Sequence, residues 1–221
     1  MKKVFLIGFT LCFALLAGSS SMAFDKVGKL GVGINGGLVV PASGDITTDS
    51  TLSDFFDVGP GFGVDLTYGV TKEFSLSSGF TYSFMKMKDE VNDDPDNEPH
   101  LNMPAIYLDG VFNFGSLMNN PNNIINPIIS TGVGIYPWKA TIDGANGDPI
   151  TFENGEEFKK TSFGINFGAG VEVFATPDLA VYAKGKYHII FSEDEDKFGT
   201  EFGNMGAISI TTGLNYYFPL H

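Results

Sequence analysis

The chain has 221 residues and a formal net charge of −13, and all 13 of its basic residues are lysines. This acidic balance excludes nucleic acid as an expected partner, because binding to a phosphate backbone requires clustered positive charge. The sequence contains 28 glycines and 21 phenylalanines and shows no helical period after residue 23. This composition predicts an all-β protein.

Residues 1–23 have the pattern of a secretory signal peptide. Two lysines follow the first methionine, an apolar run covers 4–17, and the segment closes on Ser-Met-Ala. The run is too short for a membrane-spanning helix, which needs about 20 apolar residues. We therefore predict cleavage after residue 23. One domain then covers 24–221 with a net charge of −15, and no thiol remains because Cys12 is removed.

Eight later runs alternate between apolar residues and small or polar residues, which is the period of a β-strand. Each is close to or longer than the nine to eleven residues with which a tilted strand crosses a bilayer, whereas strands in soluble domains average about five or six. The expected strands are Leu30–Val40, Gly61–Val70, Phe74–Met85, Met103–Gly115, Ile128–Trp138, Ser162–Ala175, Leu179–Phe191 and Met205–Phe218.

The connections between these runs are alternately long and short. Polar, acidic segments at 41–60, 86–102, 139–161 and 192–204 follow every second run, and shorter turns follow the others. This rhythm is typical of an eight-stranded antiparallel up-and-down transmembrane β-barrel whose long loops all lie outside the cell. The similar turns at 70–74 and 175–179 fix the register of their hairpins.

The two faces of each run differ in size and polarity. In 162–175, Phe163 and Phe167 alternate with Gly164 and Asn166. Glycine packs nothing on a solvent-exposed strand face, whereas a narrow barrel needs small side chains inside. We therefore predict that the glycine-rich face lines the lumen and that the apolar face contacts lipid. Aromatic girdles are expected at the two membrane interfaces, from Phe84, Tyr136, Trp138 and Phe191 outside and from Phe74, Phe114, Tyr216, Tyr217 and Phe218 inside.

With this pattern, the chain after residue 23 resembles the small eight-stranded outer-membrane barrels, of the type of the OmpA membrane domain and OmpX. Residues 163–182 are similar to the penultimate hairpin of that family, and Leu214–Phe218 resembles its aromatic-ended last strand. The resemblance implies a bacterial outer-membrane location. It also implies contact with outer-membrane lipid and lipopolysaccharide and recognition of the last strand by the barrel-assembly machinery. We expect no cofactor.

Polar side chains on the inward face predict an internal network. The hairpin register places Lys184 opposite Gly170 and Lys186 opposite Gly168, where space is free. Because an unpaired charge in a closed lumen is costly, we predict that both lysines pair with carboxylates. The network would act as a plug that fills the lumen, and the alternative is a polar conduction path. Its members are Asp65, Asp109, Glu172, Lys184, Lys186 and His188, with Asn35, Asn113, Asn166 and Asn215 on the same face.

The long loops are acidic, and carboxylates in such number can bind Ca²⁺ or Mg²⁺. No loop has a defined calcium-binding spacing, and charge runs of this kind usually form a solvated surface, so we expect no metal site. The residues concerned are Asp45, Asp49, Asp54, Asp57, Asp89, Glu90, Asp93, Asp94, Asp96, Glu98, Glu193, Asp194, Glu195 and Asp196.

Catalysis would require a nucleophile and a nearby base. His188 and Ser192 share a strand face but lie about 13 Å apart at about 3.3 Å per residue, too far for direct proton transfer. The other histidines after the signal peptide, His100 and His221, form no metal-type pair. We therefore expect no enzyme.

The sequence favours a barrel with a structural or surface-interaction role, in which the loops can bind a surface ligand. A narrow channel or transporter for small or apolar solutes is the alternative. A soluble periplasmic barrel holding an apolar ligand is a third interpretation.

Overall fold

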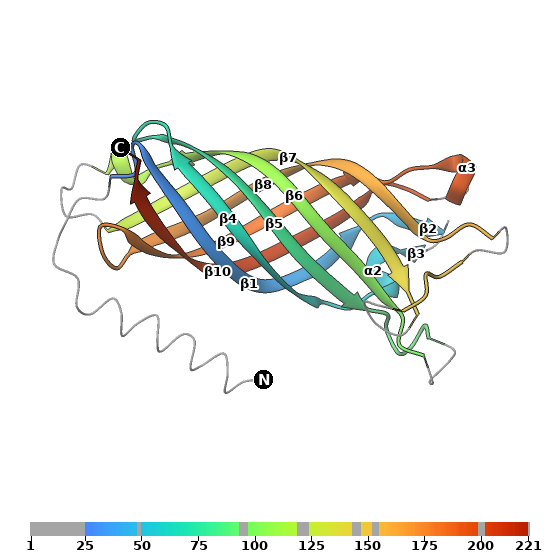
Figure 1. Ribbon diagram of the computed structural model, residues 1–221. Helices are drawn as coiled ribbons and strands as arrows, with labels where there is room; N and C mark the ends of the chain where they lie inside the picture. Colours follow the sequence, from blue (N-terminus) through green and yellow to red (C-terminus); the bar gives the residue numbers. More distant parts are fainter. Residues whose placement is uncertain are drawn as a thin grey trace.

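The computed structural model describes residues 25–47, 50–92, 97–118, 124–142, 147–151, 155–198 and 202–220, so the predicted signal peptide lies outside the described residues. Eight antiparallel strands close into one barrel in the order β1-β10-β9-β8-β7-β6-β5-β4 (Figure 1). The predicted fold is confirmed. The barrel strands are β1 Lys29–Ser43, β4 Gly59–Gly69, β5 Phe74–Lys86, β6 His100–Asn113, β7 Ile125–Thr141, β8 Lys159–Phe174, β9 Leu179–Phe191 and β10 Met205–Pro219.

Each strand pairs with its neighbours in the chain, and β1 pairs with β10 to close the barrel. The turn between β4 and β5 sets the register that its length predicts, because Val64 pairs with Phe80 and Leu66 with Ser78. Several strands run further toward the long loops than the alternating pattern indicates. The ladder between β7 and β8 continues to the pair of Lys139 and Lys159.

The outer surface of the barrel is a belt of exposed apolar side chains, as predicted for a lipid-facing wall. Ile34 is 63% exposed, and Phe62 and Ile106 are each 55% exposed. Small and polar residues on the alternate positions face the lumen, where Ser162 and Asn166 are buried. The strand period therefore places the large apolar residues where hydrocarbon can cover them, and closure pairs the backbone groups that lipid could not satisfy.

The predicted aromatic girdles need one correction. Tyr136, Trp138 and Tyr217 point into the barrel, with no more than 1% of each side chain exposed. All three occupy strand positions that alternate with exposed neighbours, such as Ile135 and Tyr216, so the two-residue period directs them inward. Of the other predicted members, Phe74, Phe191, Tyr216 and Phe218 are exposed on the outer face, and Phe84 and Phe114 are partly buried.

The long connections gather at one end of the barrel (Figure 1). They contain the short hairpin of β2 Asp45–Thr47 and β3 Ser50–Thr51 and the helical turns α2 Leu52–Phe55 and α3 Glu195–Phe198. The short turns lie at the opposite end, where the 3₁₀ turn Gly115–Leu117 follows β6. None of the helices in the described ranges is long and apolar enough to span a membrane.

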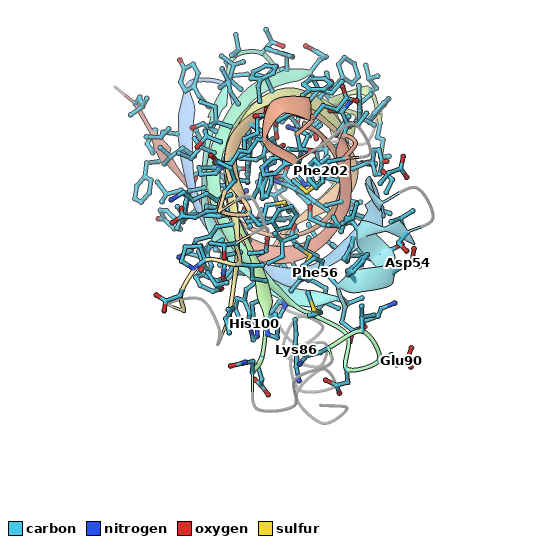
Figure 2. All side chains as sticks on the ribbon, turned by 90° about the vertical axis from the view of Figure 1, so that its right-hand side faces the viewer. Asp54, Phe56, Lys86, Glu90, His100 and Phe202 are labelled. Atoms are coloured by element: carbon cyan, nitrogen blue, oxygen red, sulfur yellow. The ribbon has the colours of Figure 1, made fainter. Side chains whose placement is uncertain are left out.

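An apolar core fills the barrel at the long-loop end. Figure 2 looks onto this end, where Phe202 lies within the outline of the barrel. The Trp138 ring stacks on Phe202 with 5.9 Å between centroids and meets Phe158 edge-on at 5.2 Å. The lumen is therefore polar only in its middle and at its short-turn end, because loop residues fold back into the mouth. The buried members are Val39, Leu52, Phe56, Met85, Leu101, Met103, Ala105, Tyr136, Trp138, Ala140, Phe158, Ile190, Phe202, Met205 and Ala207.

Candidate functional site

Glu172 on β8 organises the polar lumen at the short-turn end. Its carboxylate forms a buried ion pair with Lys26, a residue that precedes β1. It also accepts hydrogen bonds from Asn126 Nδ2 at 2.8 Å and from the Tyr217 hydroxyl at 2.9 Å. A buried carboxylate stays charged at low cost only when cations and donors surround it in this way.

Asn113 extends this cluster across the barrel. Its side-chain oxygen accepts hydrogen bonds from Lys26 Nζ at 3.2 Å and from Asn126 Nδ2 at 2.9 Å. Its amide nitrogen donates to Ser75 Oγ at 3.0 Å. Residues from β5, β6, β7 and β8 and from the segment before β1 are thereby joined at one level of the lumen. We call Lys26, Ser75, Asn113, Asn126, Glu172 and Tyr217 the floor cluster.

Asp65 on β4 is the centre of a second cluster, in the middle of the barrel. Its carboxylate accepts hydrogen bonds from the hydroxyls of Tyr107 on β6 and Tyr182 on β9. Asn35 Nδ2 donates a third at 2.9 Å. Three strands in addition to β4 therefore direct donors toward one carboxylate, which holds it in a fixed position.

The two lumen lysines differ in their partners. Lys186 forms an ion pair with Asp109, and its Nζ lies 3.7 Å from the centroid of the Tyr107 ring. Lys184 Nζ instead lies 4.2 Å from the centroid of the Tyr182 ring. No ion pair of Lys184 within 4 Å occurs among the described residues, although its charge attracts Asp65 and Glu172 at longer range. The predicted pairing of Lys184 with a carboxylate is therefore not formed as a direct contact.

His188 has partners that the sequence did not indicate. Its Nε2 lies 2.9 Å from Ser209 Oγ on β10, and its Nδ1 lies 3.0 Å from the Tyr136 hydroxyl. Ser192, the candidate weighed from the sequence, donates to the Gly203 carbonyl at 2.9 Å and accepts from the Met205 amide at 2.9 Å, so it holds the loop between β9 and β10. The imidazole is thus a link between β7 and β10.

A cavity of about 30 Å³ lies between the Asp65 cluster and the apolar core. A cavity needs only about 10–15 Å³ to hold a water molecule, so this one is large enough for ordered water. Lys184, Lys186, His188 and Asn35 line it together with Asp65. The described lumen therefore has room at this level for ordered water but is too small for a larger solute.

The tyrosines of the lumen are the residues that sequence reasoning missed most clearly. Tyr107 and Tyr182 lie two residues from Asp109 and Lys184, so the two-residue period assigns them to the inward face. Aromatic residues are expected from the sequence on the lipid-facing wall or in the girdles. The hydroxyl groups of these tyrosines were therefore not predicted as hydrogen-bond donors inside the lumen. Lys26 carried no such signal, because it lies outside every alternating run.

The backbone ladder between β6 and β7 is interrupted near the long-loop end, although the two strands keep one register on both sides of the interruption. The ladder pairs Asn102 with Lys139 and resumes at Ile106 with Ile135, and the three positions between are unpaired. Pro104 and Pro137 lie within the interrupted segments, and proline has no N–H with which to form a ladder hydrogen bond. A groove of about 430 Å³ lies here, lined by Tyr82, Asn102, Pro104, Pro137, Trp138, Lys139, Lys159, Lys160, Thr161 and Lys197.

The acidic loops show no metal-binding arrangement in the part of the chain that the structure describes, because no group of three or more potential ligands comes together there. Asp49, Asp93, Asp94, Asp96 and the terminal His221 lie outside the described residues, as do the side chains of Glu195 and Asp196.

Comparison with known proteins agrees with this architecture. Residues 11–218 match the family model described as the outer membrane protein beta-barrel domain. Neisserial surface protein A has 13% sequence identity and a TM-score of 0.57, covering 86% of this chain and 97% of that one. Ail of Yersinia pestis, solved with the heparin analogue sucrose octasulfate, has 13% identity and a TM-score of 0.51, covering 87% and 99%.

A third barrel, OprG of Pseudomonas aeruginosa, has 12% identity and a TM-score of 0.51, covering 90% of this chain and 100% of that one. No curated protein matches the sequence significantly. At such identities the likeness to solved structures concerns the fold alone.

Proposed function

The chain belongs to the outer-membrane β-barrel domain family, and we propose that it works in the outer membrane as a closed barrel with a structural or surface-interaction role. The observation that carries this proposal is the succession of filled levels along the lumen. The floor cluster, the Asp65 cluster and the apolar core follow one another, and the cavity between the last two has a volume of about 30 Å³.

A solute that crossed this lumen would have to separate buried charged groups from their partners. Breaking a buried ion pair such as Lys26 with Glu172 costs about 3–5 kcal/mol, and displacement of the apolar core would add to that cost. We therefore infer that the network of Asp65, Asp109, Glu172, Lys186 and His188 stabilises the wall and does not conduct ions.

The long loops are the surface through which such a barrel would act on its surroundings. Ail, which shares the fold, was solved with a sulfated heparin analogue. The loops of this chain carry carboxylates such as Asp57, Asp89 and Glu90, so charge complementarity favours a cationic surface ligand over a sulfated one.

Planar-bilayer recording tests the closed lumen. The refolded protein, checked by its heat-dependent mobility on a gel, should show no steady conductance. Lys186→Ala and Glu172→Ala remove one partner from each of two buried ion pairs, so they should be the variants in which leak currents appear. A steady conductance of the unaltered protein that Lys186→Ala leaves unchanged would contradict the proposal.

A lateral path for small apolar solutes is the second candidate, and the interrupted ladder between β6 and β7 favours it. The groove at this interruption reaches the otherwise buried Trp138, which belongs to the apolar core. The variant Pro104→Val/Pro137→Val restores two N–H donors and should close the interruption. If the protein transports apolar solutes, uptake into proteoliposomes should fall in this variant. Equal uptake in both proteins would remove the lateral path.

We further propose that the protein has no catalytic role. Ser209 and His188 are hydrogen-bonded, but the other imidazole nitrogen faces Tyr136 where a catalytic triad would have a carboxylate. A fluorophosphonate probe should leave the protein unlabelled. If the probe labels the protein and Ser209→Ala abolishes the labelling, Ser209 is a reactive nucleophile and the proposal is wrong.

Recognition by the barrel-assembly machinery is also a proposal. Tyr216 and Phe218 of β10 expose their rings on the outer face of the barrel, where an assembly factor can contact them. Assembly into the outer membrane in cells should be slower for Phe218→Ala than for Tyr68→Ala, an exposed aromatic of β4.

A further inference from the structure

Four lysines gather around the groove beside the β6–β7 interruption. Lys139, Lys159, Lys160 and Lys197 line it, and no carboxylate is among the lining residues. In a chain with 26 acidic and 13 basic residues, this is an unusual concentration of positive charge. The lining is therefore basic, although ion pairs with Glu157, Asp194 and Glu156 outside it offset the charges of Lys159, Lys160 and Lys197.

Two of these lysines are placed where their positive charges repel each other. Lys139 and Lys159 are direct cross-strand partners on the outer face of β7 and β8. Like charges in this position destabilise a sheet. Lys159 is paired with Glu157, but Lys139 has no ion-pair partner in the described part of the chain. An anion bound between the two ammonium groups would remove the repulsion.

The groove lies at the boundary of the apolar belt. Moving along the same ladder toward the membrane, Pro137 pairs with Thr161 and Ile135 with Phe163. Ile135 is 48% exposed and Phe163 is 51% exposed on the lipid-facing wall. Lys139 and Lys159 therefore stand four residue pairs along the ladder from Ile135 and Phe163, beyond the hydrocarbon and at the level where lipid headgroups lie.

The remaining lysines bring the strands and the loops together at this level. Lys160 pairs with Asp194 at 3.4 Å, and Lys197 Nζ donates to the Lys159 carbonyl at 3.0 Å. Tyr82 and Thr161 also line the groove, and the Tyr82 hydroxyl donates to Asn102 Oδ1 at 3.0 Å. Ammonium and hydroxyl groups are the donors with which proteins bind phosphate.

We propose that this groove binds the phosphorylated headgroup of an outer-leaflet lipid, with Lys139 and Lys159 as its principal ligands. The lipid's phosphate neutralises the cross-strand lysine pair, and its acyl chains lie along Ile135 and Phe163. The site is on the outer wall, so it does not depend on whether the lumen is closed.

The protein carries its own probe for this site. Trp138 is the only tryptophan of the chain and forms part of the groove wall. The folded protein in neutral detergent is titrated with bisphosphorylated lipid A while tryptophan emission is recorded. A saturable change in emission is expected with this lipid. No change is expected with the dephosphorylated lipid, and inorganic phosphate at the same concentration should not compete.

Two double variants locate the binding. Lys139→Gln/Lys159→Gln should weaken binding about thirtyfold, since each lysine near an anionic lipid surface contributes roughly a fivefold affinity. Lys86→Gln/Lys88→Gln makes the same change in charge at the same end of the barrel, away from the groove, and should bind as the unaltered protein does. Equal affinity in all three proteins, or equal binding of the dephosphorylated lipid, would overturn the proposal. Competition by inorganic phosphate would assign the groove to free anions and would also overturn it.

Discussion

Lys26 and Glu172 form a buried ion pair across the short-turn end of the barrel although 146 residues separate them in the sequence. Lys26 lies before the first strand and reaches into the lumen, and Glu172 belongs to β8. The pair thus ties the start of the domain to the far wall, and the side chains of Asn126 and Tyr217 complete the shell around the carboxylate.

We expect Glu172→Gln to lower the free energy of unfolding by about 3–5 kcal/mol, because it leaves the Lys26 ammonium buried without its counter-charge. Lys26→Met should have a similar effect through the unpaired carboxylate. The double variant Lys26→Met/Glu172→Gln should be more stable than the sum of the two losses predicts. Urea titration in lipid vesicles measures all three. Additive losses would mean that the two side chains act independently.

Replacing Asp65 with alanine should lower the free energy of unfolding by about 3 kcal/mol, because the Tyr107 and Tyr182 hydroxyls and the Asn35 amide lose a shared charged acceptor. Asp65→Asn keeps an acceptor and should cost less. Asp57→Ala, on the exposed loop after α2, is the matched control and should change little. If Asp65→Ala unfolds at the same urea concentration as the unaltered protein, the cluster has no structural role.

Gly79→Ala should destabilise the barrel by about 1–3 kcal/mol, because a methyl group there would overlap the Tyr107 hydroxyl and approach the Asp65 carboxylate. Gly36→Ala is the control. The nearest atom to its new methyl group would be the Gly61 carbonyl oxygen at 3.8 Å, an ordinary contact. The thermal midpoint of the folded band on unheated gels distinguishes the two. Equal midpoints for both variants would show that the lumen adapts around residue 79.

The turn at α2 should open in acid. The Thr51 backbone N–H and hydroxyl each donate to Asp54 Oδ2 at 2.8 Å and lower the pKa of that carboxyl below its ordinary value of 3.8. A lowered pKa means that the stabilisation is present at neutral pH and is lost as pH falls through the lowered value. The protection of the amides at 51–56 against hydrogen exchange, relative to their intrinsic rates, should therefore fall in that range. Asp54→Asn should lower this protection already at neutral pH, and its protection should depend less on pH.

The fold could be predicted from the sequence because its determinants are local. A two-residue period and three polar residues between 70 and 74 are sufficient to pair Val64 with Phe80. The apolar core at the long-loop end could not be predicted in this way. Phe158 and Phe202 come from acidic loops, whose composition indicates solvent exposure, and only the closed barrel brings them onto Trp138.

The lumen could be predicted in part. Strand parity directs Asp65, Glu172 and Lys186 inward, but parity does not say which carboxylate each lysine reaches, since that depends on the stagger of strands across the barrel. Lys184 therefore contacts an aromatic ring where an ion pair was expected. Pro104 and Pro137 were visible in the expected strands. Their opposition across the β6–β7 ladder follows only from the register that the connection between β6 and β7 leaves open.

The closing ladder also sets the order in which the molecule can form. Every strand pair except β1 with β10 joins neighbours in the chain, whereas closure brings Lys29 beside Pro219. Because the two strands are far apart in the sequence, bringing them together costs the most chain entropy, so this contact forms late and slowly. Until then β1 and β10 are open edges whose unpaired amides can join a strand of another molecule. The time between insertion and closure is thus the interval in which this chain is most vulnerable to aggregation.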